Sequence, residues 1–434
     1  MASVAAVFRR KKPVEPADAD RPAPPRGPEP PPPPTINNRP TLSRKLGGAT
    51  VVQIMPALRD QPGVRAALNI TGALLRSGTR VIVAADRGAF VSELQSLGAE
   101  WLRFRNTATS GWLLRRNVHR LEDLIVSDHV DIIHAYGASA ALTACAAAQH
   151  NPVWVVTSLP DGPIPDAQLG KKPITALMHG HRIFAQSVYA ALPLEQHYHL
   201  PPDRIVVVPP AIDTAAFHPN RINAESVAAL RKGWNIQPDE FVVLAPGAPT
   251  PEAGHTLLAD AARILYNRGT DGIVFVVPGV GRSRRRDFSV ITKHAKALRV
   301  DELFCLGAPA ADETALLAAA DVVAVPALTP PADGALLARA QAMAKPVIAS
   351  AIGVLPEYVL APPRMPDDLR TGWLIRPNDP VDLARAIGEV LTLSDRARHA
   401  MGVRAWQFAQ SSFSSNGVAA DTLAVYTSLL DNGS

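Results

Sequence analysis

The most constraining feature of this 434-residue chain is a regular alternation of short apolar runs and helix-length segments that begins at Gly48. The runs are rich in β-branched residues, and the segments between them place apolar residues at helical spacing. Such alternation predicts βαβ units around a parallel sheet. The runs of the first series are ATVVQIM, TRVIVAA, VDIIHAY, PVWVVTS, RIFAQS and DRIVVVPP.

A second series starts near Phe241 and predicts a second α/β domain, since a chain of this length suits two domains. Its runs are EFVVLAPG, GIVFVVPG, DELFCLG, ADVVAVPA, KPVIAS and TGWLIRP. The segment from Pro380 to Leu430 is helical in pattern, with a break around residues 411–417. We expect an α/β fold of two Rossmann-like domains, residues 48–215 and 216–400. A helical segment, residues 401–434, is expected to pack back on the first domain.

The amino-terminal 47 residues differ in composition from the rest of the chain. They hold 12 of the 41 prolines, with an unbroken run from Pro30 to Pro34. Such a segment favours solvated polyproline II and cannot build a hydrophobic core. We expect a disordered, basic, proline-rich tail that serves as a linker. A ligand for SH3-like domains and a basic membrane tether are the alternatives.

Composition limits the remaining classes of protein. With 47% hydrophobic and 19% charged residues, the chain has the content of a globular protein. No apolar run is long enough to span a membrane, and no signal-peptide pattern follows the basic Arg9–Lys12. We therefore expect a cytoplasmic protein, with at most peripheral contact at the inner face of the membrane. Cys145 and Cys305 lie in apolar stretches and suggest buried thiols. The net charge of +5 suits an anionic partner: nucleic acid, a membrane face or a phosphate-bearing ligand.

Four strings in this order resemble glycosyltransferase family 4: PPAIDTAAFHP at 209–219, ADVVAVPA at 320–327, AQAMAKPVIASAIGVLPEYV at 340–359 and TGWLIRPNDPVDLARAI at 371–387. The first keeps the Asp213 and Phe217 of the family's interdomain signature. The resemblance covers about residues 48–430. It implies a GT-B fold, two facing Rossmann-like domains with the active site in an interdomain cleft, and sugar transfer from a nucleotide-diphosphate sugar with retention and without a metal cofactor.

The resemblance also implies that an arginine and a lysine clamp the donor diphosphate in the loop after the first strand of the second domain. Cations belong there because the departing nucleotide develops negative charge. The matching text is APGAPTPEAGHTLL, which places Ala248 at the arginine and Ala253 at the lysine. The neighbouring candidates for the donor cleft are Gly247, Gly254 and His255.

The resemblance further implies a pair of glutamates eight positions apart. One of them contacts the sugar hydroxyls, and the other contacts the ribose. Carboxylates accept hydrogen bonds from vicinal hydroxyls, which explains the residue type. The matching positions carry Pro331 and Arg339. Arg339 is a donor-only cation, so it mismatches a ribose diol but could meet a phosphate.

The amino-terminal domain departs from the family in the same way. The family's glycine pair after the first strand aligns with Gln61 and Pro62, and proline removes an amide donor. The family's histidine after the fourth strand aligns with Pro160. These positions join Ala248, Ala253, Pro331 and Arg339 as degraded family positions.

Several backbone features of the donor cleft remain as candidates. Gly279 and Gly281 keep a turn after a strand, and Gly353 and Glu357 keep the loop after KPVIAS. A G-x-G at a strand end suits either nucleotide approach or a tight strand-to-helix turn. The arginine run that begins at Arg282 suits either a solvated loop or a phosphate-capturing loop.

For the remaining candidate residues, the sequence favours structural roles over catalytic or metal-binding ones. His134 follows an apolar run, and histidine at this strand end packs at the domain core of the family that the chain resembles. HGHR at 179–182 is interpreted as a helix-to-strand junction, because zinc spacing is absent from the sequence. There is no G-x-S-x-G elbow and no Walker A lysine, which argues against hydrolases and ATPases.

Three hypotheses follow. The first is a retaining glycosyltransferase of surface polysaccharide or lipopolysaccharide biosynthesis, acting on a glycan or lipid-linked acceptor. The second is an inactive pseudo-glycosyltransferase, a binding or scaffolding subunit beside an active partner, which the lost site residues favour. The third, which we do not expect, is nucleic-acid binding through the basic tail. We expect neither a metal nor another cofactor.

Overall fold

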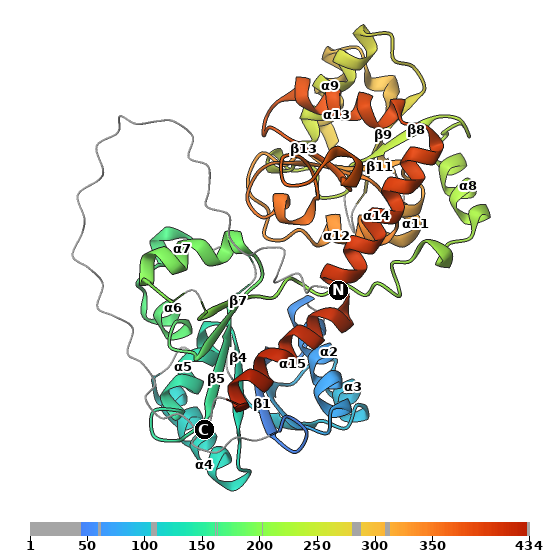
Figure 1. The fold of residues 1–434 in the computed structure, drawn as a ribbon. Coiled ribbons are helices and arrows are strands. Elements are labelled where there is room, and N and C mark those ends of the chain that lie inside the picture. The colour runs from blue at the N-terminus through green and yellow to red at the C-terminus, as the bar shows by residue number, and fades with distance from the viewer. Residues whose placement is uncertain are drawn as a thin grey trace, which may run out of the picture. The chain divides into compact units, whose positions relative to one another are not determined.

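The computed structural model describes residues 45–59, 62–105, 111–160, 162, 164–201, 203–279, 288–308 and 313–431. It divides the chain into two compact units. The amino-terminal unit runs to Pro210 and resumes at Asn416, and the carboxy-terminal unit is Ala211–Ser415. Each unit is an α/β layer structure in which helices cover both faces of a sheet (Figure 1).

The amino-terminal unit contains a seven-stranded sheet of order β3-β2-β1-β4-β5-β6-β7, in which the paired strands are parallel. Its elements are β1 (Thr50–Ala57), α2 (Pro62–Arg76), β2 (Arg80–Asp86), α3 (Val91–Ser96), β3 (Glu100–Arg103), α4 (Gly111–Ser127), β4 (Ile132–Tyr136), α5 (Ala138–Ala147), β5 (Trp154–Ser158), α6 (Lys172–Leu177), β6 (Arg182–Ala185), α7 (Val188–Tyr198) and β7 (Ile205–Val207), with α15 (Ser415–Asp431) added from the carboxy terminus.

The carboxy-terminal unit contains a six-stranded parallel sheet of order β10-β9-β8-β11-β12-β13. Its elements are α8 (Ala224–Gly233), β8 (Phe241–Leu244), a short 3-10 turn η3 (Pro251–Ala253), α9 (His255–Asn267), β9 (Ile273–Pro278), α10 (Ser289–Ala297), β10 (Phe304–Ala308), α11 (Glu313–Ala318), β11 (Val322–Val325), α12 (Ala335–Ala342), β12 (Val347–Ser350), a 3-10 turn η6 (Leu355–Tyr358), β13 (Gly372–Ile375), α13 (Pro380–Thr392) and α14 (Asp395–Phe413).

The twelve apolar runs identified in the sequence all form strands, so the prediction of two parallel-sheet α/β domains is confirmed. β3 is an additional strand that the pattern did not predict. Its four residues, EWLR, lie at the edge of the sheet, with both charged ends exposed and only the two central side chains half-buried. Such a short edge strand carries too few apolar positions to form a recognisable run.

The carboxy-terminal helices are divided differently from the predicted boundary at residue 401. α14 belongs to the carboxy-terminal unit, because Met401 is part of its core and a Cβ on Gly402 would overlap the carbonyl of Ala344. α15 belongs to the amino-terminal unit, where Tyr426 is fully buried. The chain also breaks between α13 and α14, which the helical pattern did not indicate.

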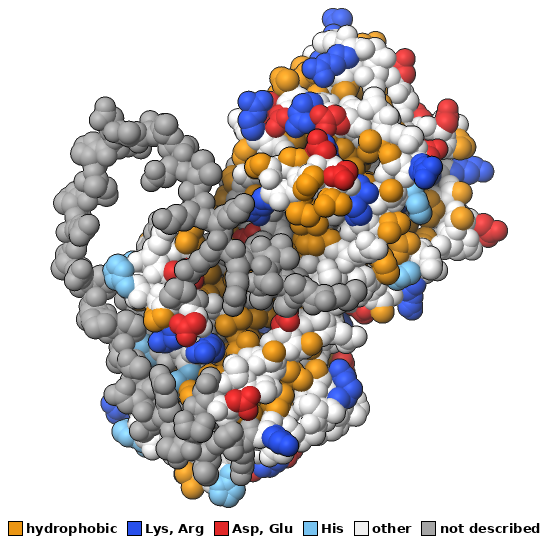
Figure 2. Space-filling view, viewed as in Figure 1, with side chains coloured by type: hydrophobic (Ala, Val, Ile, Leu, Met, Phe, Trp, Pro, Cys, Tyr) orange, Lys and Arg blue, Asp and Glu red, His pale blue; other side chains and the backbone are white. Residues whose placement is uncertain are grey.

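α15 covers the face of the amino-terminal sheet that α2 and α3 also cover (Figure 1). Leu429 and Leu430 join Val51 of β1 and Leu68 of α2 in one apolar cluster. Figure 2 shows that positive and negative side chains lie next to one another on the visible face of the carboxy-terminal unit.

Candidate functional site

Loops that follow parallel strands gather at one edge of a sheet, and ligands of open α/β sheets bind at that carboxyl edge. In the carboxy-terminal unit this edge is formed by the segments after β8, β11 and β12, at residues 245–255, 326–339 and 351–358. The sequence-predicted donor residues of this unit lie in these segments and after β9.

The loop after β8 keeps the backbone that a nucleotide would need. Gly247 and Gly254 both have left-handed φ, at +127° and +71°, which favours glycine. A Cβ on Gly254 would overlap the carbonyl oxygen of Pro326, so the loop approaches the segment after β11 closely. Ala248 is exposed and Ala253 is half-buried. The turn is therefore intact, while the two positions expected to carry cations present methyl groups.

His255 is the first residue of α9 and is only 2% exposed. Burial lowers the pKa of His255 to about 4, because the interior solvates the imidazolium poorly; the carbonyls of Ala245 and Pro246 oppose this shift. The ring is therefore neutral near pH 7. Its Nδ1 has no hydrogen-bond partner among the described residues. His255 does not replace the missing positive charge.

Glu252, in η3, brings a negative charge into this loop. Its own backbone amide, and then the Thr250 side chain, hold the pKa of this fully exposed carboxyl below its usual value. The Leu328 amide donates to the Glu252 carbonyl at 2.8 Å, which ties the loop to the segment after β11. A carboxylate thus stands between the two positions where diphosphate-binding cations were expected.

The segment after β11 carries a second carboxylate at a helix start. Asp333 accepts a hydrogen bond from the Ala335 amide at 2.9 Å, and Ala335 is the first residue of α12. The amino terminus of a helix is a natural site for an anion, and here the chain itself supplies that anion. Pro331, at the first expected glutamate position, is half-buried and carries no polar side chain.

Arg339, at the second expected glutamate position, already has an anionic partner. Its Nε donates to Glu313 Oε1 at 2.8 Å, and Glu313 is the first residue of α11. The guanidinium carbon lies 5.7 Å from the centre of the Phe217 ring, within cation–π distance. Arg339 is therefore neutralised and stacked by residues of its own unit.

The loop after β12 holds the last two candidates. Gly353 has φ +58°, and a Cβ there would lie 2.6 Å from Pro330, so this turn also requires glycine. Glu357 lies in η6, half-buried, and its charge together with that of Asp333 contributes to raising the pKa of the Tyr358 hydroxyl, although burial is the main cause. Tyr358 stacks on Phe413 with ring centres 4.7 Å apart.

Sequence reasoning missed the carboxylates of the three segments after β8, β11 and β12. Within the three segments, Glu252, Asp333 and Glu357 are carboxylates, and Arg339 is the one guanidinium. The Arg364 Nη1 donates to the Pro356 carbonyl at 3.1 Å, which brings one further cation next to η6. Glu252 is predictable from the sequence, since it lies between Ala248 and Ala253.

Three buried polar atoms near the end of β12 have no hydrogen-bond partner among the described residues: Ser350 Oγ, Tyr358 Oη and Gln341 Oε1. Gln341 uses its amide group to donate to the carbonyls of Leu337 and Tyr358. These groups were not indicated by the sequence, and their chemistry alone does not specify a ligand.

Some sequence-predicted candidates lie elsewhere or outside the description. Gly279 follows β9, and a Cβ there would make only ordinary contact with Gly307, at 3.5 Å. Gly281 and Arg282, with the rest of the arginine run, lie outside the described residues, as does Gln61. In the amino-terminal unit, Pro62 begins α2 and Pro160 is exposed after β5.

The two tempting histidine positions have the expected structural roles. His134 is fully buried, and its two ring nitrogens lie 2.6 Å from the Tyr426 hydroxyl and 2.7 Å from Ser158 Oγ. Burial lowers the pKa of His134 to about 3. HGHR joins α6 to β6, and the His181 Nδ1 accepts a hydrogen bond from the Val155 amide.

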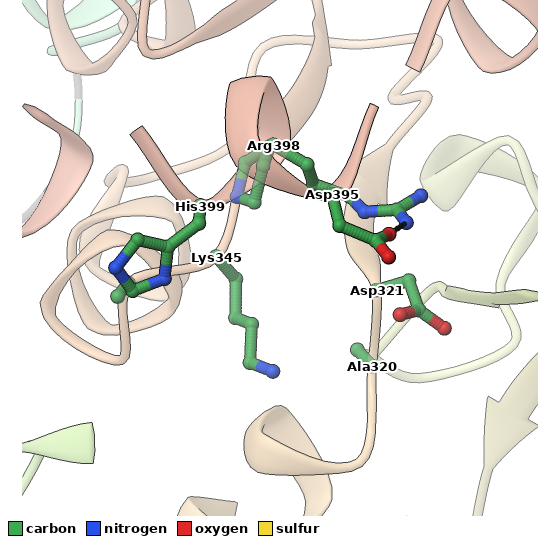
Figure 3. A pocket seen from close by; sticks show the side chains of 8 residues that line it. Ala320, Asp321, Lys345, Asp395, Arg398 and His399 are labelled. Carbon is green, nitrogen blue, oxygen red and sulfur yellow. Dashed lines mark hydrogen bonds and ion pairs between the residues drawn. The ribbon is translucent and has the colours of Figure 1, made fainter. Parts of the chain in front are cut away.

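A pocket of about 200 Å³ lies at the opposite edge of the carboxy-terminal sheet. Figure 3 shows Asp321 and Lys345, which precede β11 and β12, beside Asp395, Arg398 and His399 of α14. The Lys345 ammonium donates to the Ala318 carbonyl at 2.8 Å, and burial lowers the pKa of Lys345. Because the pocket lies at the amino ends of the strands, it is not the expected donor site.

In the described part of the chain, no group of three or more His, Cys, Asp or Glu residues is placed to hold a metal ion. None of its helices is long and apolar enough to cross a membrane.

Comparisons with known proteins match both parts of the chain to glycosyltransferase families. The family described as "Glycosyltransferase Family 4" matches residues 63–216, and "Glycosyl transferases group 1" matches residues 226–407. A D-inositol 3-phosphate glycosyltransferase of Streptomyces scabiei is 29% identical over 57% of this chain and 54% of its own length. One of Salinispora tropica is 31% identical over 61% of this chain and 54% of its own length. The chain spans about half the length of these curated relatives.

Solved structures of similar fold cover most of the chain. A glycosyltransferase from Rickettsia africae aligns with a TM-score of 0.72 at 20% identity, over 88% of this chain and 99% of its own. The Anabaena protein Alr3699/HepE in complex with UDP aligns with a TM-score of 0.66 at 18% identity, over 88% of this chain and 100% of its own. At such identities the likeness shows the fold.

Proposed function

Because this chain belongs to glycosyltransferase family 4, we propose that it serves surface polysaccharide or lipopolysaccharide biosynthesis as a member that does not transfer sugar. It acts as a binding or scaffolding subunit beside an active glycosyltransferase, at the inner face of the membrane. The observation that carries this proposal is the ion pair of Arg339 with Glu313, because it neutralises the one cation of the three donor-side segments.

The chemistry of donor cleavage explains why this charge pattern matters. Departure of a nucleoside diphosphate places negative charge on the leaving oxygen, and this charge must be met by aligned donors or cations. Losing one such donor typically costs about 10²-fold to 10³-fold in rate. Here Ala248 and Ala253 supply no charge, and Glu252 and Asp333 add negative charge at the starts of α9 and α12. The segments therefore repel a diphosphate rather than hold it.

The carboxylates also explain how the fold tolerates the absence of the cations expected at Ala248 and Ala253. Asp333 satisfies an amide at the start of α12 that a bound phosphate could otherwise satisfy. The Glu252 carbonyl holds the loop after β8 to the next segment. Because these bonds are internal, the loops keep their order without a nucleotide, as a scaffolding role requires.

A titration with UDP-, GDP- and ADP-sugars, combined with an assay of donor hydrolysis and transfer, tests the proposal. The wild-type protein is expected to show no turnover. Binding in the micromolar range with turnover would refute the proposal. A variant that restores the expected family residues, Ala248→Arg, Ala253→Lys, Pro331→Glu and Arg339→Glu, should gain donor affinity. Exchange of two exposed alanines of the same unit, Ala297→Arg and Ala229→Lys, serves as a control for added positive charge.

Active sugar transfer is the second candidate, and the preserved backbone favours it. Gly247, Gly254 and Gly353 keep the turns that let a nucleotide approach, and His255 starts a 13-residue helix whose amino terminus favours an anion. The curated relatives named above are sugar transferases with a phosphorylated acceptor in their name. Turnover by the wild-type protein that is lost in Arg339→Ala would support this alternative and a repurposed phosphate site.

A further inference from the structure

The pocket at the amino edge of the carboxy-terminal sheet is lined by charged side chains from three segments (Figure 3). We call it the α14 pocket and define it by Asp321, Lys345, Asp395, Arg398 and His399. Its volume of about 200 Å³ is below the roughly 300–1,000 Å³ of pockets that hold drug-sized ligands. The α14 pocket therefore suits a small ion or the charged group of a small molecule.

Lys345 directs its ammonium group inward rather than into solvent. The Nζ donates to the carbonyl of Ala318, the last residue of α11, at 2.8 Å. An ammonium has three N–H donors, and this is the one hydrogen bond that Nζ makes among the described residues. Burial is the main reason why the pKa of Lys345 is lowered; Asp321 opposes the shift, and Arg231 adds to it. A charge that is partly removed from water gains from a further anionic partner.

A second buried cation, Arg231 of α8, stands behind the wall of the α14 pocket. Its Nη2 lies 3.6 Å from the Asp321 Oδ2, and the Val242 amide donates to the same oxygen at 2.9 Å. The Arg231 Nε is buried and has no hydrogen-bond partner among the described residues. Asp321 is therefore shared between an amide and two cations, and its single charge does not balance both Arg231 and Lys345.

The first turn of α14 supplies the opposite wall. The Arg398 guanidinium lies 5.3 Å from the centre of the Phe241 ring and pairs with Asp395. The side chain of Asp395 is 97% exposed, so solvent screens its charge strongly. Arg231, Lys345 and Arg398 together bring more positive charge to the α14 pocket than its two carboxylates cancel.

The backbone brings these groups together before any ligand binds. Ala344 has φ +56°, in the left-handed region that favours glycine, and it directly precedes Lys345. A Cβ on Gly402 of α14 would overlap the Ala344 carbonyl, so the helix packs closely against this turn. The cost of ordering the cationic side chains is therefore partly met by folding.

We propose that the α14 pocket binds a phosphate group, either as inorganic phosphate or as the phosphate of a small phosphomonoester. A tetrahedral oxyanion offers several acceptor oxygens, which suits donors that come from Lys345, Arg398 and His399 at separate points of the wall. The α14 pocket lies at the amino ends of the strands, away from the loops expected to hold a sugar donor. This inference goes beyond the proposed function and does not depend on it.

Titration of the full chain with inorganic phosphate, followed by NMR of the alanine methyl groups, tests the proposal. Ala320 and Ala344 line the α14 pocket, whereas Ala248 and Ala253 lie in the loop after β8. We expect saturable shifts of the first pair, with a dissociation constant of about 1 mM or below, and no change in the second pair. Shifts of the second pair alone, or no saturable shift up to about 10 mM phosphate, would overturn the proposal.

Glycerol 3-phosphate distinguishes the two sources of the phosphate group. If it shifts Ala320 and Ala344 at lower concentration than inorganic phosphate does, a phosphomonoester is the ligand. The reverse order identifies free phosphate. Glycerol without phosphate should shift neither residue, and equal shifts with glycerol would contradict recognition of the phosphate group.

Charge-removing variants test the assignment of the binding residues. Lys345→Met and Arg398→Gln should each weaken phosphate binding about tenfold, because each removes a charge-assisted hydrogen bond. Urea unfolding without phosphate checks that Lys345→Met still folds, and Arg398→Gln keeps the test decisive if it does not. Arg396→Gln is the matched control, because Arg396 is exposed on the same helix and does not line the α14 pocket. Equal losses in Arg396→Gln and Arg398→Gln would indicate a non-specific charge effect and contradict the proposal.

Arg339→Ala separates this site from the donor edge. The variant removes the guanidinium of the donor-side segments and should leave phosphate binding unchanged. Phosphate binding that is lost in Arg339→Ala and kept in Arg398→Gln would place the anion at the donor edge and refute the α14 pocket as its site.

Discussion

The guanidinium of Arg339 donates to the carboxylate of Glu313 at 2.8 Å and stacks over Phe217. The same position in the family that the chain belongs to is expected to hold a glutamate that contacts the donor. The replacement therefore reverses the charge expected at this position. The carboxylate of Glu313, on the neighbouring helix α11, then neutralises the arginine. Packing and charge pairing are thus preserved at a position where the expected donor-contacting glutamate is replaced.

Glu313→Gln should release Arg339 to meet an added anion. The pair is partly exposed, with 28% and 39% of the two side chains accessible, and such pairs contribute about 0.2–1 kcal/mol. We therefore expect UDP binding to strengthen by about twofold to fivefold, measured by ligand-observed NMR at millimolar UDP. Glu302→Gln removes an exposed carboxylate of the same unit and should have no effect. A gain that persists in the Glu313→Gln, Arg339→Ala variant would contradict this account of Arg339.

Gly254→Ala should destabilise the carboxy-terminal unit strongly. The residue has φ +71°, and its new Cβ would overlap the Pro326 carbonyl. The left-handed backbone costs about 1 kcal/mol, and the overlap brings the expected loss to about 3 kcal/mol or more. Gly269→Ala is the matched control, because Gly269 has φ +74° with no described heavy atom within 4 Å of the added Cβ. Urea unfolding measures both variants, and equal losses would contradict the close approach of the two loops.

Tyr426→Phe should loosen α15 from the amino-terminal unit. The hydroxyl and the His134 Nδ1 are both buried and lie 2.6 Å apart, so the variant leaves a buried ring nitrogen without its partner. We expect a loss of about 1–3 kcal/mol in the free energy of unfolding. Tyr266→Phe removes a hydroxyl from a side chain that is 53% exposed and should change stability little. Proteolysis within α15 should quicken in the first variant alone.

Acid should destabilise the protein through its buried histidines. Burial lowers the pKa of His134 to about 3 and that of His255 to about 4, below the usual value of about 6.5. The unfolded chain therefore binds more protons between pH 4 and 6.5, and stability is lost as pH falls through this window. Each histidine contributes up to about 1.4 kcal/mol per pH unit. His255→Asn should reduce the pH dependence of the urea midpoint, and an unchanged slope would contradict the burial of a neutral ring.

The sequence predicted the fold well because burial of parallel strands produces continuous apolar runs, and each of the twelve runs is a strand. β3 escaped detection because only Trp101 and Leu102 of its four residues are half-buried. The division between α14 and α15 depends on which core each helix packs against, and a helical pattern does not contain that information.

The candidate site was predictable only in part. The replaced positions could be found because each is defined by its place relative to a recognisable string. The partners of those positions could not, since Glu313 lies 26 residues before Arg339 and is brought close only by the packing of α11 and α12. The effects of Asp333 and Glu252 depend on their places at the starts of α12 and α9. A residue-by-residue comparison of sequences does not contain those places.

Calorimetric titration of the full-length wild-type chain with UDP-sugars tests the central claim most directly, which is that the donor-side segments lack the charge to hold a nucleoside diphosphate. The account predicts no saturable heat up to about 1 mM ligand, which corresponds to binding weaker than about −4 kcal/mol. Saturable binding in the low micromolar range that is lost in Arg339→Ala would contradict it.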